Sequence, residues 1–107
     1  MKRIIRHYKN KQTGYMDLFT IEYRENSNGT VALWCITHPR DPHGKGVSVH
    51  HLYESGQICV TKGREPRSME HAEAIAFSWM LGWSEYIRTG TFPNRGRNVR
   101  VPDREAS

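Results

Sequence analysis

Hydrophobic and polar residues alternate over two neighbouring segments near the start of the chain. In residues 16–24, apolar side chains such as Phe19 and Ile21 fall at every second position, which is the period of a β-strand with one buried face. Residues 30–37 alternate in the same way. Because the turn-forming cluster Asn26–Gly29 lies between the two segments, they are predicted to pair as an antiparallel hairpin.

Shorter elements are predicted on both sides of this hairpin. Prolines and glycines interrupt residues 38–46, which are therefore predicted to form a loop, since proline removes a hydrogen-bond donor and glycine weakens a strand. The other elements predicted before the helix are a short strand at residues 3–8, a third main strand at 47–53, a turn at 54–56, a short extended stretch at 57–61 and a polar loop at 62–67.

The clearest element is a helix that begins after Ser68. Serine is a favoured N-cap residue, and Glu70 follows in the first turn, where the helix dipole favours a negative charge. Gly90 is a natural stop after Arg88. The apolar residues with helical spacing on one face are Ala72, Ile75, Ala76, Trp79, Met80, Trp83, Tyr86 and Ile87. The tryptophans of this helix are expected to belong to the core.

Strands first and a helix last predict an α+β fold, in which an antiparallel β-meander of three to four strands packs against one C-terminal amphipathic helix. The chain has 107 residues, which corresponds to one domain. Residues 1–14 are predicted as a basic N-terminal lead-in and residues 15–92 as the single α+β domain. Residues 93–107 are polar and contain two prolines, so we expect a loosely held tail there.

Composition narrows the class of protein. Hydrophobic residues make up 36% and charged residues 25%, as in a globular chain. No segment approaches the roughly 18 continuous apolar residues that a membrane span needs, so no membrane association is expected. Residues 1–7 are basic, but no apolar run follows them as in a secretory signal. With two cysteines only, we expect the reducing cytoplasm and no disulfide.

The formal net charge is +5, and much of the excess lies near the two ends of the chain. The basic residues concerned are Lys2, Arg3, Arg6, Lys9, Lys11, Arg95, Arg97, Arg100 and Arg104. A positive surface attracts nucleic acid or an acidic protein, but basic termini also serve solubility alone. The charge therefore leaves all three interpretations open.

The segment around Cys59 carries the most informative chemistry. Cys59 follows a tight turn, and two histidines, His50 and His51, stand close upstream. The thiolate is the nucleophilic form of cysteine, and Lys62 and Arg64 just downstream could add the positive potential that favours it. The alternative is that Cys59 is an ordinary small buried residue at the end of a strand.

Residues 51–60, His-Leu-Tyr-Glu-Ser-Gly-Gln-Ile-Cys-Val, resemble the active-site segment of ubiquitin-conjugating enzymes. In that family a His-Pro-Asn run leads, through a glycine, to an Ile-Cys-Leu that contains the thioester cysteine. Gly56 and Cys59 have the family's spacing, and Tyr53 falls where the family often has an aromatic residue. Aligned on Cys59, the oxyanion-stabilising asparagine of the family corresponds to His51, and an imidazole N–H could serve as such a donor.

The end of the predicted helix adds to this resemblance. Residues 79–92 are similar to the end of small bacterial members, in which a tryptophan-rich helix runs into a Thr-Gly-aromatic ending. The resemblance covers residues 16–92. It implies a transferase without cofactor, in which Cys59 accepts a ubiquitin-like modifier as a thioester from an activating enzyme and passes it to an amine.

The sequence also departs from the family. The proline and asparagine of the His-Pro-Asn run are absent, and the approach to it, residues 39–49, is shorter than usual. No long N-terminal helix is predicted, although eukaryotic members dock their activating enzyme there. A non-catalytic module of the same fold, which binds protein or nucleic acid through its basic surface, therefore remains the alternative function.

Two further groups of residues suggest other functions. Cysteine and histidine are zinc ligands, and the chain offers Cys35, His38, His43, His50, His51 and Cys59. These six do not form two pairs with zinc-site spacing, so no metal is expected. An aromatic sheet face that stacks single-stranded nucleic acid could be built from Tyr8, Tyr15, Tyr23 and Trp34. These aromatic residues are interleaved with aliphatic ones, which is also the pattern of a core.

Overall fold

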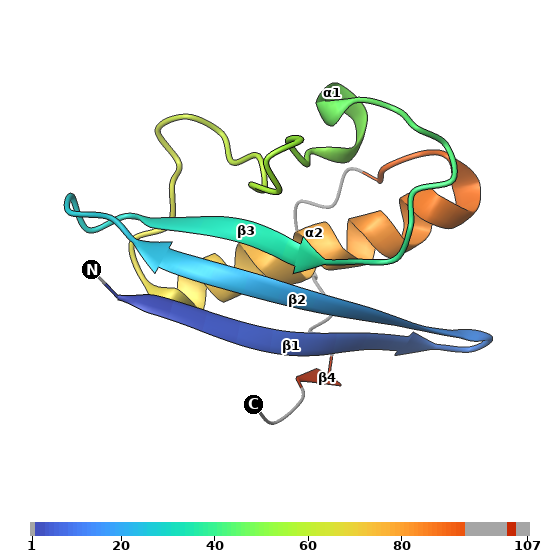
Figure 1. Ribbon diagram of the computed structural model, residues 1–107, viewed down its shortest axis with the longest axis horizontal. Helices are drawn as coiled ribbons and strands as arrows, with labels where there is room; N and C mark the ends of the chain where they lie inside the picture. The colour runs from blue at the N-terminus through green and yellow to red at the C-terminus, as the bar shows by residue number, and fades with distance from the viewer. Residues whose placement is uncertain (1, 94–102, 105–107) are drawn as a thin grey trace.

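The computed structural model describes residues 2–93 and 103–104. Three long strands, β1 (Arg3–Gln12), β2 (Tyr15–Glu25) and β3 (Val31–Thr37), form an antiparallel meander, and helix α2 (Met69–Thr89) lies across one face of it (Figure 1). The two-residue strand β4 (Asp103–Arg104) pairs with β1, so the strand order is β3-β2-β1-β4. The predicted α+β fold is confirmed.

Strand β1 is longer than predicted and includes most of the predicted lead-in. It pairs with β2 along its whole length, and Gly14, with a φ of 91°, closes the tight turn between them. Tyr8 and Asn10 are buried under the helix, whereas Lys9 and Lys11 point to the other face. The lysines made this segment look like a polar lead-in, although alternate positions are in the core.

The predicted third strand at residues 47–53 is wrong. Residues Val47–His50 form the single helical turn α1, which begins after Gly46 and ends at His51 in the left-handed conformation, with a φ of 60°. Residues 56–58 occupy the edge of β3 instead. There the backbone N–H of Cys35 donates to the Gly56 carbonyl at 2.8 Å, and the backbone N–H of Ile58 donates to the Leu33 carbonyl at 2.9 Å. Because this edge is taken, residues 47–50 have no strand to pair with.

Both predicted ends of the helix are confirmed. The Ser68 hydroxyl accepts a hydrogen bond from the His71 N–H at 3.1 Å, which satisfies a backbone donor in the first turn. At the other end Gly90 adopts a φ of 81°, and its N–H donates to the Tyr86 carbonyl at 2.7 Å. A left-handed glycine at this position turns the chain back toward the helix it has just left.

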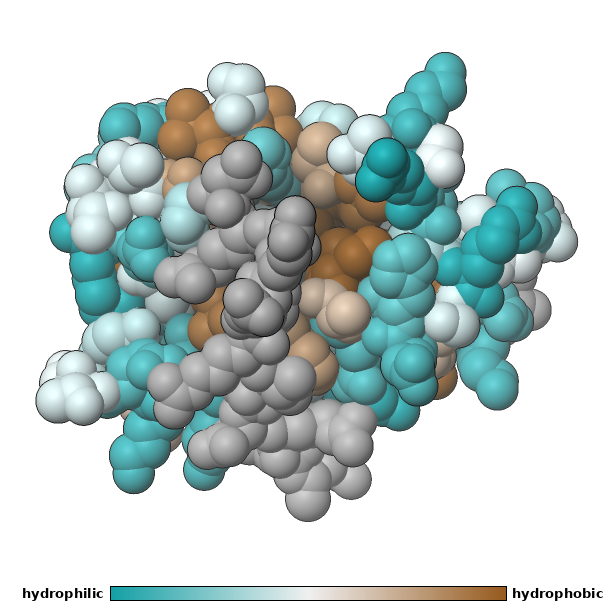
Figure 2. Space-filling model, turned by 180° about the vertical axis from the view of Figure 1, so that it is seen from behind, coloured by the Kyte–Doolittle hydropathy of each residue, from teal (hydrophilic) through white to brown (hydrophobic). Residues whose placement is uncertain are grey.

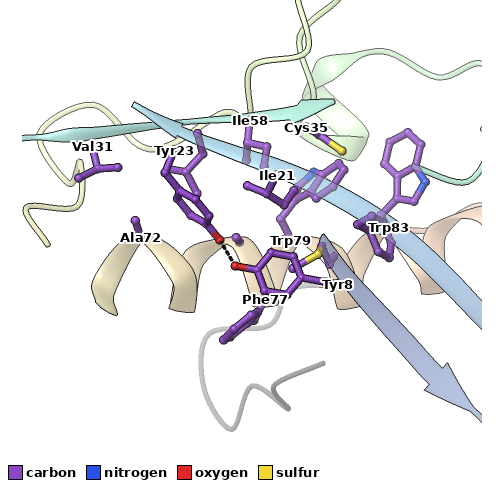
Figure 3. Close-up of a cluster of buried hydrophobic side chains, with 14 of the residues drawn as sticks. Tyr8, Ile21, Tyr23, Val31, Cys35, Ile58, Ala72, Phe77, Trp79 and Trp83 are labelled. Carbon is purple, nitrogen blue, oxygen red and sulfur yellow. Dashed lines mark hydrogen bonds between the residues drawn. The ribbon is translucent and has the colours of Figure 1, made fainter. Parts of the chain in front are cut away.

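The core lies between the sheet and α2, and aromatic side chains fill much of it (Figure 3). Tyr8 and Tyr23 point toward each other, and their hydroxyls lie 2.7 Å apart. Tyr8 also donates to Glu73 at 2.7 Å. Burial raises the pKa of both phenols, so they stay protonated and act as structural hydrogen-bond partners. The helix tryptophans, Trp79 and Trp83, belong to this core, as predicted.

The aromatic sheet face that could have stacked nucleic acid is not formed, and its tyrosines Tyr8 and Tyr23 belong to the core. Tyr8 and Tyr23 are 0% and 1% exposed and face the helix, as does Tyr15, whereas Trp34 lies on the opposite face of the sheet. Four aromatic residues on two faces cannot stack successive bases of one strand.

Two further observations concern the surface of the molecule and the length of its helices. On the side turned away from the viewer in Figure 1, apolar residues show in separate patches at the upper left and to the right of the centre, and hydrophilic residues lie mainly toward the periphery (Figure 2). Within the part of the chain that the structure describes, no helix is long and apolar enough to cross a membrane.

Candidate functional site

The segment that contains Cys59 forms a small hairpin against the outer edge of β3. Gly56 donates to the Tyr53 carbonyl at 2.8 Å and closes a four-residue turn. Leu52 and Ile58 pair directly across the hairpin, and the backbone N–H of Cys59 donates to the His51 carbonyl at 2.8 Å. We call residues 51–59 the cysteine hairpin. It brings together residues that lie eight positions apart in the sequence.

Gly56 is required at the turn for two reasons. Its φ of 95° lies in the region that favours glycine. In addition, a Cβ at this position would lie 3.2 Å from the Cys35 carbonyl oxygen, because the hairpin approaches β3 closely here. The glycine therefore sets both the turn and the distance between hairpin and sheet.

The two faces of the cysteine hairpin differ in chemistry. Ile58 points into the core and is 2% exposed, and Leu52 packs beside it. Tyr53 and Cys59 lie on the opposite face, and the backbone of His51 is paired with that of Cys59. This arrangement places the Tyr53 hydroxyl 3.6 Å from the Cys59 sulfur, to which it donates. Two residues that the sequence singles out, Tyr53 and Cys59, thus meet on one surface.

The two thiols of the chain have contrasting surroundings, and both are free. Burial raises the pKa of Cys35 to about 12, and its thiol donates to the Thr37 carbonyl at 3.1 Å. Cys59 is partly exposed and accepts a hydrogen bond from Tyr53. That bond raises the pKa of the Tyr53 hydroxyl, so the phenol remains a donor to the sulfur. Cys59 is therefore the thiol that solvent and reagents can reach.

Three side chains of α2 hold the loop before the cysteine hairpin. The indole N–H of Trp79 donates to the His50 carbonyl at 3.0 Å, and that of Trp83 donates to the Pro39 carbonyl at 3.0 Å. The Tyr86 hydroxyl donates to Asp41 at 3.1 Å. The carbonyls of Pro39 and His50 accept these hydrogen bonds from side chains of α2 and not from the backbone of a strand or helix.

Asp41 is a centre of this loop. Its carboxylate accepts the backbone N–H groups of His43 at 2.8 Å and Gly44 at 3.2 Å, besides the Tyr86 hydroxyl. Burial alone would raise the pKa of Asp41, but these hydrogen bonds and the nearby His50 outweigh it and lower the pKa. The charged carboxylate therefore organises the loop.

His50 links the loop to the cysteine hairpin. The residue is 9% exposed, and its ring packs against Trp83 and Tyr86, with Nε2 3.9 Å from the Asp41 carboxylate. Nδ1 accepts the N–H of Leu52 at 3.2 Å, so this nitrogen carries no proton in the described arrangement. The buried imidazole of His50 therefore fixes the backbone of Leu52, the residue that follows His51.

The other sequence-predicted residues lie apart from this surface. Lys62 and Arg64 are exposed in the turn after Cys59, which the Arg64 N–H closes by donating to the Thr61 carbonyl at 2.9 Å. Among residues 2–93 and 103–104, no three His, Cys, Asp or Glu side chains converge where they could hold a metal ion.

Two open hollows flank the turn of the cysteine hairpin, and Tyr53 lines both. The larger, of about 1000 Å³, lies between the end of β3 and α1, with Lys45, His50 and Trp83 in its wall. The smaller, of about 670 Å³, lies between the start of β3 and residues 57–67. Neither Cys59 nor His51 is among the residues that line these two hollows.

Sequence reasoning missed Asp41 and Tyr86, which hold the loop before the cysteine hairpin in place. The spacing of Trp79, Trp83 and Tyr86 on one helical face was visible, but their polar atoms gave no signal of a partner in the sequence. Comparisons of the chain with protein-family models, with curated proteins and with solved structures find no match.

Proposed function

We propose that this protein is a thioester-forming transferase that resembles small bacterial ubiquitin-conjugating enzymes. The observation that carries the proposal is the hydrogen bond from Tyr53 to Cys59, because a donor aimed at an accessible sulfur stabilises the thiolate, which is the nucleophile. The backbone hydrogen bond that places His51 beside Cys59 also supports it.

The proposed reaction has two steps. The Cys59 thiolate attacks the thioester carbonyl that joins a ubiquitin-like modifier to its activating enzyme. A carbon–sulfur bond forms at Cys59, and the bond to the activating enzyme breaks with release of that enzyme's thiolate. An amine then attacks the new thioester, an amide forms, Cys59 leaves as thiolate, and the amine's proton passes to solvent. His51 would donate a hydrogen bond to the oxyanion in the second step.

Alkylation of the two thiols tests the first requirement. Native protein is treated with iodoacetamide across a pH series, and mass spectrometry follows each cysteine. Cys59 is expected to react fast and Cys35 slowly, with Cys59→Ser as the assignment control. Tyr53→Phe, which removes only the hydroxyl, should slow alkylation at neutral pH by about threefold. Equal rates for the two cysteines, or no effect of Tyr53→Phe, would remove the basis of the proposal.

A short peptide thioester tests transfer without knowledge of the modifier or its activating enzyme. The probe is the mercaptoethanesulfonate thioester of the peptide, which exchanges onto an active-site thiol and releases mercaptoethanesulfonate. We expect acylation of Cys59 and its discharge by free lysine. His51→Ala should load normally and discharge slowly. No acylation above the level seen with Cys59→Ser would refute the proposed activity.

A second candidate function is a binding module that docks an acidic protein on the outer face of the sheet. Four half-exposed apolar residues lie there, namely Ile5, Met16, Leu18 and Ile36. The cations on the same face are Arg3, Lys9, Lys11 and Arg24. Its acidic residue Glu22 is already paired with Arg3 and Arg24. Aliphatic surface bordered by positive charge suits an acidic, partly apolar protein segment better than it suits bases.

Replacements of two neighbouring residues on this face distinguish an acidic protein partner from nucleic acid. Leu18 pairs directly with Lys9 across β1 and β2. A fluorescent peptide of alternating glutamate and leucine should lose affinity in both Leu18→Ser and Lys9→Glu. A single-stranded oligoribonucleotide would respond to Lys9→Glu and to salt, but not to Leu18→Ser. Binding of the oligonucleotide alone favours nucleic acid, and binding of neither probe argues against the module.

A further inference from the structure

The segment that follows α2 folds back along the helix and ends against the cysteine hairpin. Gly90 turns the chain in the left-handed conformation, and Phe92 then lies on the helix at Gly82. A Cβ at Gly82 would lie 2.3 Å from the Phe92 Cζ atom, which no real side chain allows. The aromatic ring therefore fills a seat that only glycine provides.

The other side of this ring meets His51. The two ring centroids are 5.0 Å apart with an interplanar angle of 79°, which is an edge-to-face contact. His51 is exposed, and its backbone is held by the Val47 carbonyl of α1 and by the Cys59 N–H of the hairpin. An exposed side chain samples several rotamers unless a neighbour selects one. Phe92 is the aromatic neighbour that the structure gives to this imidazole.

We propose that Phe92 is a positioning residue that holds the His51 imidazole in one orientation beside Cys59. The chemical consequence of this orientation rests on the proposed transferase function, whereas the orientation itself does not. Phe92 acts through His51, and its own position is set by Gly82 and the turn at Gly90.

The size of the effect follows from the contact. An edge-to-face aromatic pair is strong enough to change the population of the held rotamer by about twofold to tenfold. Misplacement of a catalytic donor by about 1 Å can slow a reaction by up to about a hundredfold. Loss of Phe92 should therefore slow discharge of the thioester measurably, without affecting its formation.

Three variants of the full chain separate positioning from stability. Phe92→Ala removes the ring, and Phe92→Leu keeps an apolar side chain on Gly82 as the conservative replacement. Met69→Ala is the control, because Met69 is also partly buried against the core but lies at the first residue of α2, about 20 Å from Gly82 along the helix axis. All three are compared by urea unfolding, so that each assay is run where the chain is folded.

The first measurement is independent of any activity. NMR of the imidazole protons and carbons of His51 should show a ring-current shift and restricted motion in the parent protein. Phe92→Ala should lose both, Phe92→Leu should regain part of the restriction, and Met69→Ala should keep both. A His51 ring that is equally mobile in the parent and in Phe92→Ala would overturn the inference.

The second measurement uses the peptide thioester of mercaptoethanesulfonate. Loading of Cys59 should be unchanged in Phe92→Ala, whereas discharge by lysine should fall about tenfold, and Phe92→Ala should cause no loss in a His51→Ala background. Discharge in Phe92→Ala equal to that in Met69→Ala would overturn the inference, even with normal loading. If Cys59 never loads in the parent protein, the proposed function fails, and the NMR result alone decides whether Phe92 positions His51.

Discussion

The replacement Gly82→Ala should destabilise this protein, although the same change stabilises most exposed helix interiors. In a helix, alanine is favoured over glycine by about 1 kcal/mol. Here the new methyl carbon would meet three atoms of the Phe92 ring at 2.3, 2.6 and 2.8 Å, so the whole ring must move outward. Forcing an extra carbon into a packed contact costs about 1–3 kcal/mol. The expected net effect is a loss of about 1 kcal/mol.

A double-mutant cycle makes the reasoning testable. When Phe92→Ala has removed the ring, Gly82→Ala should stabilise the chain by about 1 kcal/mol, because only the helix propensity remains. Urea unfolding of the four proteins, followed by fluorescence of the buried Trp79 and Trp83, measures the coupling, which should be about 2 kcal/mol. If Gly82→Ala stabilises the chain equally in both backgrounds, Phe92 does not occupy the seat on Gly82.

Three further replacements test the loop and the hairpin. Trp79→Phe leaves the buried His50 carbonyl without its donor and should cost about 2 kcal/mol in urea unfolding, whereas an unchanged midpoint would contradict the anchoring role. The pKa of Asp41 is lower in the folded state than in the unfolded chain. The stability of the parent relative to Asp41→Asn should therefore be greatest above about pH 5 and should decrease as the pH falls through that lowered pKa. Thermal unfolding of both proteins at several pH values measures this difference, and a difference that does not change with pH would contradict the reasoning. Gly56→Ala places a left-handed alanine against the Cys35 carbonyl and should lower the free energy of unfolding by about 1–2 kcal/mol. Hydrogen exchange at the Cys35 amide should become faster, and an unchanged exchange rate would mean that the hairpin stays docked.

Local sequence signals were sufficient to predict those elements for which tertiary packing favours the same conformation as the local sequence. The strands β2 and β3 follow from alternation with a turn between them, and the helix from its serine cap, its apolar spacing and the glycine stop. The turn before Cys59 follows from Glu-Ser-Gly. In each case the signal and the packing favour the same conformation.

The rest depends on contacts between distant parts of the chain. Residues 47–50 alternate like a strand, yet they form a helical turn, since residues 56–58 hold the edge of β3 and Trp79 holds the His50 carbonyl. Which face of the sheet the tyrosines occupy is decided by where α2 packs. The contact of Phe92 with His51 joins two segments that no periodicity relates.

The docking of the cysteine hairpin also governs how this chain meets other copies of itself. The outer edge of β3 is covered by three backbone hydrogen bonds, from Cys35 to Gly56, from Ile58 to Leu33 and from Val31 to Pro66. An uncovered strand edge is a template for pairing with another chain. Release of the hairpin would expose such an edge on a strand rich in β-branched and aromatic residues. The segment that carries Cys59 therefore also keeps the edge of β3 from pairing with another chain.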